Sequence, residues 1–298
     1  MRRFSAIVRT TAFETQSEPL ALLLAFGAVA TTTLASVLHF HQFGEPSRMA
    51  RDAGLSSILV FGLLHAVFMS IRVFRREIET GTIEMALARS VSRTGFFLAK
   101  LSGVVLSTML FWFTATLVAM TTITGAEVGG MIAARSGNLA RIWGFSVALN
   151  AATIVVPLVA AAALNRFARV RFTATATRLV AIAAALSFVA CTALALPAVP
   201  AALRFVTAAV VALFPLPVFA AAAAAFSVRW KDSAAASLCG LLFLASLPVL
   251  PNYYLSTSLA GGGIIPPGRI AATAVAAVPF FAAFAALGIH LFNNRDAG

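Results

Sequence analysis

Charged residues are scarce in this chain of 298 residues: only 11% are Asp, Glu, Lys or Arg, whereas 60% are hydrophobic. A soluble domain carries about 25% charged residues, so a water-facing globule could not bury this much apolar surface. The composition excludes a soluble enzyme, a disordered chain and a fibrous repeat. We therefore expect a protein whose solvent is partly lipid.

Cysteine and recognisable active-site motifs are also sparse. Cys191 and Cys239 each lie in an apolar run without a second Cys or a His at ligand spacing, which argues against a disulfide framework or a zinc site. Neither an H-E-x-x-H nor a G-x-x-x-x-G-K-[ST] motif occurs. His39 and His41 form an H-x-H without an evident third ligand, so interfacial packing is favoured over metal binding. We expect no catalytic residue, no metal site and no cofactor in this chain.

Acidic residues are missing from every long apolar run, and the expected outer loops hold only Glu45, Asp52 and Glu127. Ion-driven carriers usually keep carboxylates at membrane depth to bind the coupling ion. An embedded transferase would also be expected to offer acids near a membrane face. His65 is the one ionisable residue well inside a run, and packing against a neighbouring helix is its favoured explanation. A secondary carrier is therefore disfavoured.

Long apolar runs are abundant, and most have the roughly 17–25 residues that a spanning helix needs. Pro215 and Pro217 lie in the middle of one run and predict a kinked or broken helix there. The fold class we predict is all-α: a polytopic membrane helix bundle of about eight spans, forming a single domain over 1–298. The runs are Pro19–Leu38, Leu55–Ile71, Phe96–Thr124, Ile142–Leu164, Leu179–Leu196, Phe205–Val228, Ser233–Leu250 and Ile270–Phe292.

Basic residues are distributed unevenly between the two sides that eight spans create. The side with both termini holds 16 of the 22 Lys and Arg residues, and the other side holds 6. Because cytoplasmic loops carry the excess of Lys and Arg, we predict a multi-pass protein of the cell (inner) membrane with both termini cytoplasmic.

The first residues show helical spacing of apolar side chains. Phe4, Ile7, Val8 and Ala12 recur on one face, with basic and polar residues between them. This pattern is typical of an amphipathic helix lying on a membrane surface, so we predict an interfacial helix over 2–14. An ordinary basic tail is the alternative.

The segment Arg72–Lys100 differs from every other loop because it mixes six bases with three acids. A loop that only fixes topology needs no acids, and mixed charges suit a polar contact with another protein. Thr82 can cap a helix that starts at Ile83, and Leu87 then lies on the same face as Ile83, where both could enter a partner's groove. A solvated juxtamembrane linker is the alternative.

The run E-I-E-T-G-T-I-E-M-A-L-A-R-S-V-S-R resembles the cytoplasmic loop of ABC transporter permeases of the ABC-2 type. That family combines E-x-x-x-G-T-x-E with L-x-R-P-x-S-R and a following Lys. Ser90 departs from the pattern, because the family usually has Pro there. The matching residues are Glu77, Gly81, Thr82, Glu84, Leu87, Arg89, Ser92, Arg93 and Lys100.

The resemblance covers most of the chain. The amphipathic start is similar to the family's interfacial elbow helix, and Phe226-Ser227 to its inner turn between the fourth and fifth helices. Pro251-Asn252-Tyr253-Tyr254, followed by a Gly/Pro-rich stretch, is similar to its last outer segment. The family core has six spans, so the surplus pair is expected within Ile142–Leu196.

The resemblance implies the permease subunit of an ATP-driven transporter. Its partners would be a cytosolic ATPase that carries ATP and Mg, a second permease copy or paralogue, and the lipid bilayer, but no nucleic acid. An ATPase-coupled subunit that acts on envelope proteins or lipoproteins without transport is the alternative. Residues 72–95 would form the coupling-helix loop, with the helix at Ile78–Arg89. The coupling residues would be Glu77, Ile78, Glu79, Gly81, Thr82, Ile83, Glu84, Leu87, Arg89 and Arg93.

Overall fold

The structure, a computed structural model, describes residues 2–37, 47–80, 92–136, 140–194, 199–246 and 265–294. Within these ranges every regular element is an α-helix, which confirms the predicted all-α class. The helices are α1 (Arg2–Gln16), α2 (Pro19–Val37), α3 (Arg48–Glu79), α5 (Arg93–Ser136), α6 (Ala140–Ala168), α7 (Phe172–Leu194), α8 (Val199–Leu213), α9 (Pro215–Arg229), α10 (Asp232–Ser246) and α13 (Pro267–Asn293).

Six helices of the described ranges are long and apolar enough to cross a membrane, with α8 and α9 counted as one. The bent pair α1 and α2, which meet at 63°, makes a seventh. These helices are those of a multi-pass membrane protein. The apolar helix α10 has 15 described residues. The rest of the run Ser233–Leu250 lies outside the described residues, so the eighth span stays a prediction.

Two helices extend well beyond the apolar runs that predicted them. α3 includes Asp52 and α5 includes Glu127, so the sequence-based placement of these acids in outer loops is wrong. The physical reason is that a helix continues wherever its backbone hydrogen bonds continue, and Arg and Glu support it nearly as well as Leu. The carboxylate of Glu127 accepts a hydrogen bond from Ser47 and lies 3.8 Å from Arg51 Nη1, which ties α5 to α3.

The predicted break in the sixth run is confirmed. α8 ends at Leu213 and α9 begins at Pro215, with Phe214 between them. The amide of Phe214 donates to the carbonyl of Val211 at 3.3 Å. Pro215 has no amide hydrogen and Pro217 follows two residues later, so two helix hydrogen bonds cannot form here.

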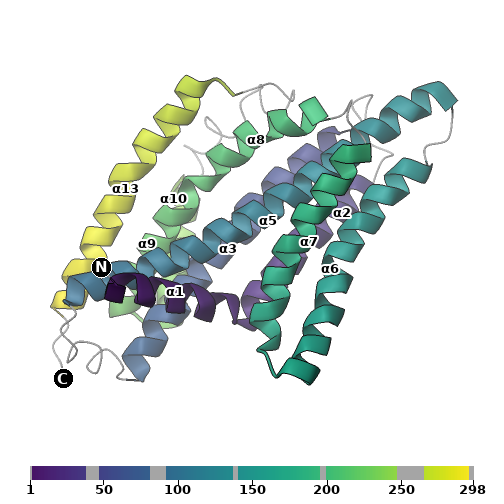
Figure 1. The fold of residues 1–298 in the computed structure, drawn as a ribbon. Coiled ribbons are helices and arrows are strands. Elements are labelled where there is room, and N and C mark those ends of the chain that lie inside the picture. The colour runs from purple at the N-terminus through teal and green to yellow at the C-terminus, as the bar shows by residue number, and fades with distance from the viewer. Residues whose placement is uncertain are drawn as a thin grey trace.

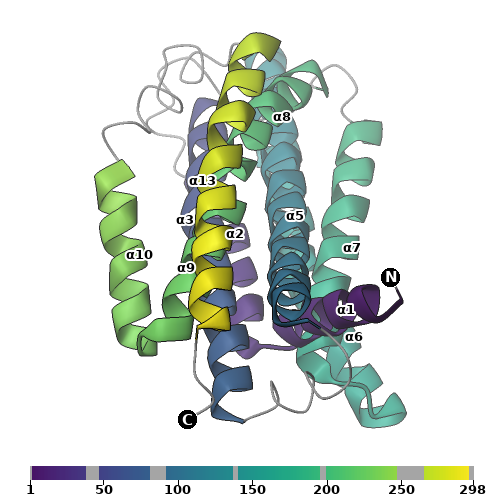
Figure 2. The same cartoon turned by 90° about the vertical axis from the view of Figure 1, so that its left-hand side faces the viewer.

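α5 runs through the middle of the bundle, where it contacts α1, α2, α3, α6, α7, α8, α9 and α13 (Figures 1 and 2). Figure 1 shows α1 crossing the end of the bundle at which α3 ends and α5 begins, which we call the loop end. The α6–α7 turn, the α9–α10 turn and the last turn of α13 lie at the same end. This arrangement agrees with the predicted placement of both termini on one side.

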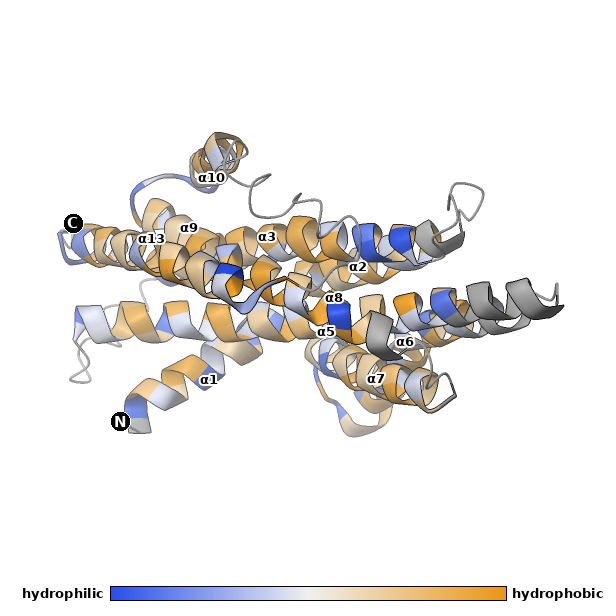
Figure 3. Ribbon diagram, turned by 90° about the horizontal axis from the view of Figure 1, so that it is seen from above, coloured by the Kyte–Doolittle hydropathy of each residue, from blue (hydrophilic) through white to orange (hydrophobic). Residues whose placement is uncertain are grey.

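The helices differ in how much protein surrounds them. In the apolar window of α5, 67% of the residues are buried, whereas in that of α13 only 6% are. Hydrophobic residues line these helices along their length (Figure 3). In α9 the run Ala220–Ala225 is fully buried, because small side chains let the neighbouring helices approach closely. The weakly buried helices therefore present apolar surface to lipid.

α6 and α7, which correspond to the predicted surplus pair, form an antiparallel hairpin beside α5 (Figure 1). Asn150 Nδ2 of α6 donates to Thr122 Oγ1 of α5 at 2.8 Å. The hydroxyls of Thr153 and Ser187 lie 3.0 Å apart and join α6 to α7. Buried polar contacts of this kind hold helices together where lipid provides no hydrophobic drive between them.

Candidate functional site

The loop that carries the family resemblance is described at its two ends. Glu77, Ile78 and Glu79 are the last residues of α3, and Arg93 is the first residue of α5. Arg72–Glu79 continue α3, so the described first part of the segment 72–95 is helical and continuous with a span. The coupling helix predicted at 78–89 lies mostly outside the described residues and stays a prediction. Charged side chains with good helix propensity explain the extension. The other predicted coupling residues lie outside the described residues: Gly81, Thr82, Ile83, Glu84, Leu87 and Arg89.

A buried ion cluster closes the base of this loop. Lys100 Nζ of α5 lies 2.6 Å from Glu77 Oε1 of α3 and 3.5 Å from Glu14 Oε2 of α1. We call these three residues the Lys100 cluster. The Lys100 side chain is only 7% exposed, and its ammonium lies 5.7 Å from the centroid of the Phe96 ring. The buried ammonium thus lies next to two carboxylates, of which Glu77 is 17% exposed and Glu14 35%.

The Lys100 cluster joins three helices that are far apart in sequence. Glu77 lies in the last turn of α3, where the loop begins. Lys100 lies seven residues into α5, just after the loop ends. Breaking one partner of a buried ion pair is strongly unfavourable because the remaining charge stays buried. The cluster therefore makes α1, α3 and the start of α5 move together.

Further polar contacts fasten the same loop to the rest of the bundle. They reach the α1–α2 turn, α10 and α13, so both arms of the loop are held by neighbouring helices. The contacts are Arg72 Nη1 to Glu18 Oε2 at 3.3 Å, Arg75 Nε to Asp232 Oδ1 at 3.0 Å, Arg75 Nη2 to Glu79 Oε1 at 3.1 Å, and Arg93 Nη1 to the carbonyl of Asn293 at 3.1 Å.

Aromatic rings fill the space behind these contacts. The ring centroids of Phe74 and Phe97 are 4.8 Å apart, and those of Phe97 and Phe292 are 5.9 Å apart. A Cβ at Gly288 of α13 would overlap the ring of Phe97, so α13 approaches α5 as closely as a glycine allows. Because well-packed cores deform little, a displacement of the loop arms is passed on to α13.

The inner face of the amphipathic helix α1 packs against α5. A Cβ added at Gly103 of α5 would lie 2.6 Å from Thr11 Cβ and 2.9 Å from the carbonyl oxygen of Val8, so the two helices touch through backbone. Thr11 and Ala12 are buried, whereas Phe4 is 44% exposed. The helix predicted over 2–14 is therefore present, and it packs on α5 as well as offering apolar surface at its start.

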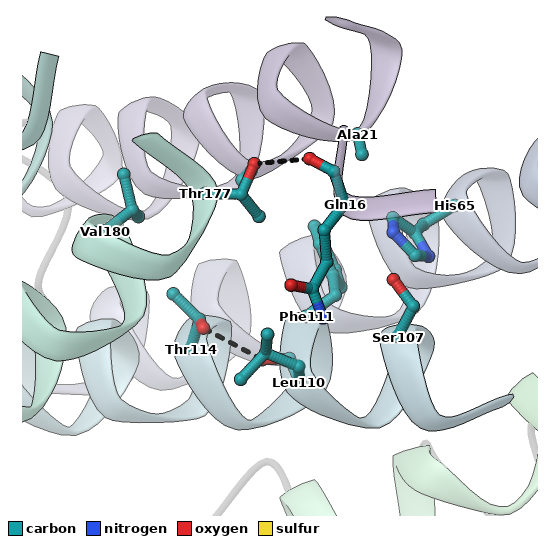
Figure 4. Close-up of a pocket in the computed structure, with 10 residues that line it drawn as sticks. Gln16, Ala21, His65, Ser107, Leu110, Phe111, Thr114, Thr177 and Val180 are labelled. Atoms are coloured by element: carbon teal, nitrogen blue, oxygen red, sulfur yellow. Dashed lines mark hydrogen bonds between the residues drawn. The ribbon is translucent and has the colours of Figure 1, made fainter. Parts of the chain in front are cut away.

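A small pocket with a cavity volume of about 20 Å³ lies beside the α1–α2 junction. Figure 4 shows the side chain of Gln16 between Thr177 and the ring of His65. His65 is 2% exposed, and its ring stacks on Phe111 at 5.2 Å. His65 Nδ1 lies 3.2 Å from Thr108 Oγ1, whose own hydrogen points to a backbone carbonyl, so Nδ1 donates.

His65 is the one titratable residue that lines the pocket, together with Gln16 and the hydroxyl-bearing residues Ser107, Thr114 and Thr177. The prediction that His65 packs against a neighbouring helix is confirmed by its contacts with α5.

The described residues contain no group of three or more His, Cys, Asp or Glu that could hold a metal ion. His39 and His41 lie outside the described residues. Cys191 and Cys239 are buried, free thiols, in agreement with their interpretation as small apolar residues.

Sequence reasoning identified Lys100 through the family resemblance but missed Glu14. A carboxylate on the inner side of an otherwise basic amphipathic helix is a signal that could have found it, because such a group needs a buried cation. Sequence reasoning likewise did not predict the ion pair between Arg72 and Glu18. No protein-family model, no curated protein and no solved structure matches this chain.

Proposed function

We propose that this chain is the membrane-spanning permease subunit of an ABC transporter of the ABC-2 type. A separate cytosolic ATPase would bind the loop between α3 and α5, and a second permease copy or paralogue would complete the pore. The chain itself would break no bond. It would lie in the inner membrane with both termini in the cytoplasm.

The observation that carries the proposal is the way the loop is held at its base. The Lys100 cluster joins the two arms of the loop to α1, and separate contacts reach the α1–α2 turn, α10 and α13. A topology loop needs no such attachment. A loop that receives force from a partner does, because the force must reach the membrane helices.

The distribution of acids supports an external source of energy. In the described spans, α3 carries Asp52 in its first turns and Glu77 and Glu79 in its last turn, and Glu127 lies in the part of α5 beyond its apolar run. All four are near helix ends, whereas an ion-coupled carrier would need a carboxylate in the middle of a span. ATP binding would close the ATPase pair, draw the loops together and shift the spans between inward-facing and outward-facing states.

Affinity purification of the full chain from its native membrane tests the proposal. We expect a stoichiometric ATPase that carries a phosphate-binding loop, identified by mass spectrometry, and ATP hydrolysis by the purified complex. Purification of a membrane protein that carries out flux without any nucleotide-binding partner would contradict the proposal and favour a secondary carrier. An ATPase complex without measurable substrate flux would favour the non-transporting alternative.

The proposed orientation makes a separate prediction at the α6–α7 turn. In a background with Cys191 and Cys239 replaced by alanine, Arg169→Cys should be labelled by a membrane-impermeant maleimide in inside-out vesicles only. Arg169 is exposed in the turn, so access is not limited by packing. Arg48→Cys, exposed at the opposite end of the bundle, is the matched control and should be labelled in intact cells. Labelling of position 169 in intact cells would exclude the eight-span topology.

A further inference from the structure

Two arginines of the α6–α7 hairpin converge on one aromatic ring of α1. The guanidinium carbons of Arg171 and Arg178 lie 5.9 Å and 4.7 Å from the centroid of the Phe13 ring. Arg178 Nε also donates to Gln16 Oε1 at 3.0 Å. These contacts fix the direction of both side chains while leaving them exposed. Two exposed guanidinium groups thus lie against the same aromatic ring.

Their charge is not compensated by a carboxylate in the part of the chain that the structure describes. The nearest acids in sequence to Phe13 are Glu14 and Glu18, and these pair with Lys100 and Arg72. Arg166, in the last turn of α6, and Arg169, in the α6–α7 turn, add two more exposed positive charges. Since like charges repel, a group of four arginines without an acid favours an anionic ligand.

The turn keeps an arginine where the backbone disfavours one. Arg169 has a φ of 53°, in the left-handed region that glycine adopts more readily. Asn165 Nδ2 holds the turn by donating to the carbonyl of Val170 at 2.7 Å. A strained residue at an exposed position indicates a use for its side chain.

Apolar side chains stand beside these charges. Phe167 is 83% exposed and Val170 is 42% exposed. The turn extends beyond α1, which lies across the loop end of the bundle (Figures 1 and 2). Exposed basic and apolar side chains next to an amphipathic helix are typical of contact with the headgroup layer of a membrane.

We infer that Arg171 and Arg178, assisted by Arg166 and Arg169, bind the phosphate of an anionic phospholipid in the leaflet at the loop end. A guanidinium group matches the oxygens of a phosphate through two parallel hydrogen bonds. The position beside α1 and the exposed Phe167 favour a lipid over a soluble acidic partner. The inference requires a membrane-embedded chain, but it does not depend on an ATPase partner.

Native mass spectrometry of the full chain, purified alone in detergent, tests this inference. Phosphatidylglycerol and phosphatidylcholine are added in equal amounts, and the lipids retained are counted. We expect the wild type to retain phosphatidylglycerol preferentially. In Arg171→Gln/Arg178→Gln the affinity for phosphatidylglycerol should fall about tenfold or more, whereas the double lysine variant, which keeps the charge but not the planar guanidinium, should lose less.

The control pair is Arg48→Gln/Arg269→Gln, which removes the same charge from exposed positions at the opposite end. A loss equal to that of Arg171→Gln/Arg178→Gln would show an effect of net charge only and overturn the inference. Loss of the contacts that Arg171 and Arg178 make with Phe13 could disturb α1. The variant Arg166→Gln/Arg169→Gln leaves these contacts intact, and it should also weaken lipid binding. A wild type without lipid preference would overturn the inference as well.

Two competitors separate the possible sources of the anion. Glycerol 3-phosphate at millimolar concentration should not displace phosphatidylglycerol; if it does, the site binds a soluble phosphate rather than a lipid. An oligoglutamate peptide that binds in an arginine-dependent way, in the absence of any preference for phosphatidylglycerol, would assign the surface to an acidic protein instead.

Discussion

Lys100→Met should lower the free energy of unfolding by about 3 kcal/mol, the lower end of the cost of removing one partner of a buried ion pair. Lys100 is 7% exposed and the side chain of Glu77 is 17% exposed, so water replaces the ammonium only in part. Removing Glu77 as well, in Lys100→Met/Glu77→Gln, should restore at least half of the loss. Reversible unfolding of the purified chain in SDS-containing mixed micelles measures the three free energies.

The control is Lys231→Met, which removes an exposed lysine from the α9–α10 turn at the same end of the bundle. A surface change of this kind usually alters stability by less than about 0.5 kcal/mol. If Lys100→Met behaved like Lys231→Met, or if Glu77→Gln added to the loss instead of reducing it, the Lys100 cluster would have no structural role.

Glu84→Arg should weaken binding of the proposed ATPase by about 2–5 kcal/mol, the usual cost of breaking a buried charged pair in an interface. This corresponds to a loss in affinity of about thirtyfold or more. Glu84 lies outside the described residues, so the prediction depends on the family resemblance and on the attached base of its loop. Co-purification of the ATPase and its stimulated hydrolysis, in one membrane preparation, are the measurements.

Arg48→Glu is the matched charge reversal, since Arg48 is exposed at the far end of α3. It should leave both measurements unchanged. Glu127 is unsuited as a control because it contacts Ser47 and Arg51, and its reversal would disturb the junction of α3 and α5. Equal behaviour of Glu84→Arg and Arg48→Glu would reduce the segment to a plain topology loop.

Local patterns predicted the helices well because membrane helices carry their signal in contiguous residues. Apolar length identified α6, α7 and α13, the spacing of Ile7 and Val8 identified α1, and Pro215 identified the break before α9. The ends of α3 and α5 were missed for a physical reason. The ends of an apolar run indicate where the membrane ends and not where the helix ends. A helix can continue into water through residues such as Glu77 and Glu127.

Contacts between distant segments could not be predicted in the same way. Glu14 and Lys100 are 86 residues apart, and no spacing rule connects an acid on one helix with a lysine on another. The close approach of α1 to Gly103 has the same character, since a glycine in an apolar run looks the same whether or not a neighbour touches it. Such pairs depend on how the helices are arranged, which only the structure provides.

The attachment of α1 has a consequence for biogenesis. The partners of the polar groups of α1 are made much later than α1 itself: Lys100 follows Glu14 by 86 residues, and Thr177, which donates to the carbonyl of Gln16, follows by 161. At about 5–20 residues per second, the ribosome needs roughly 8–30 seconds to supply the second partner. During this interval α1 has only the lipid surface to cover its apolar face, and it can dock only after α5 and α7 have entered the membrane.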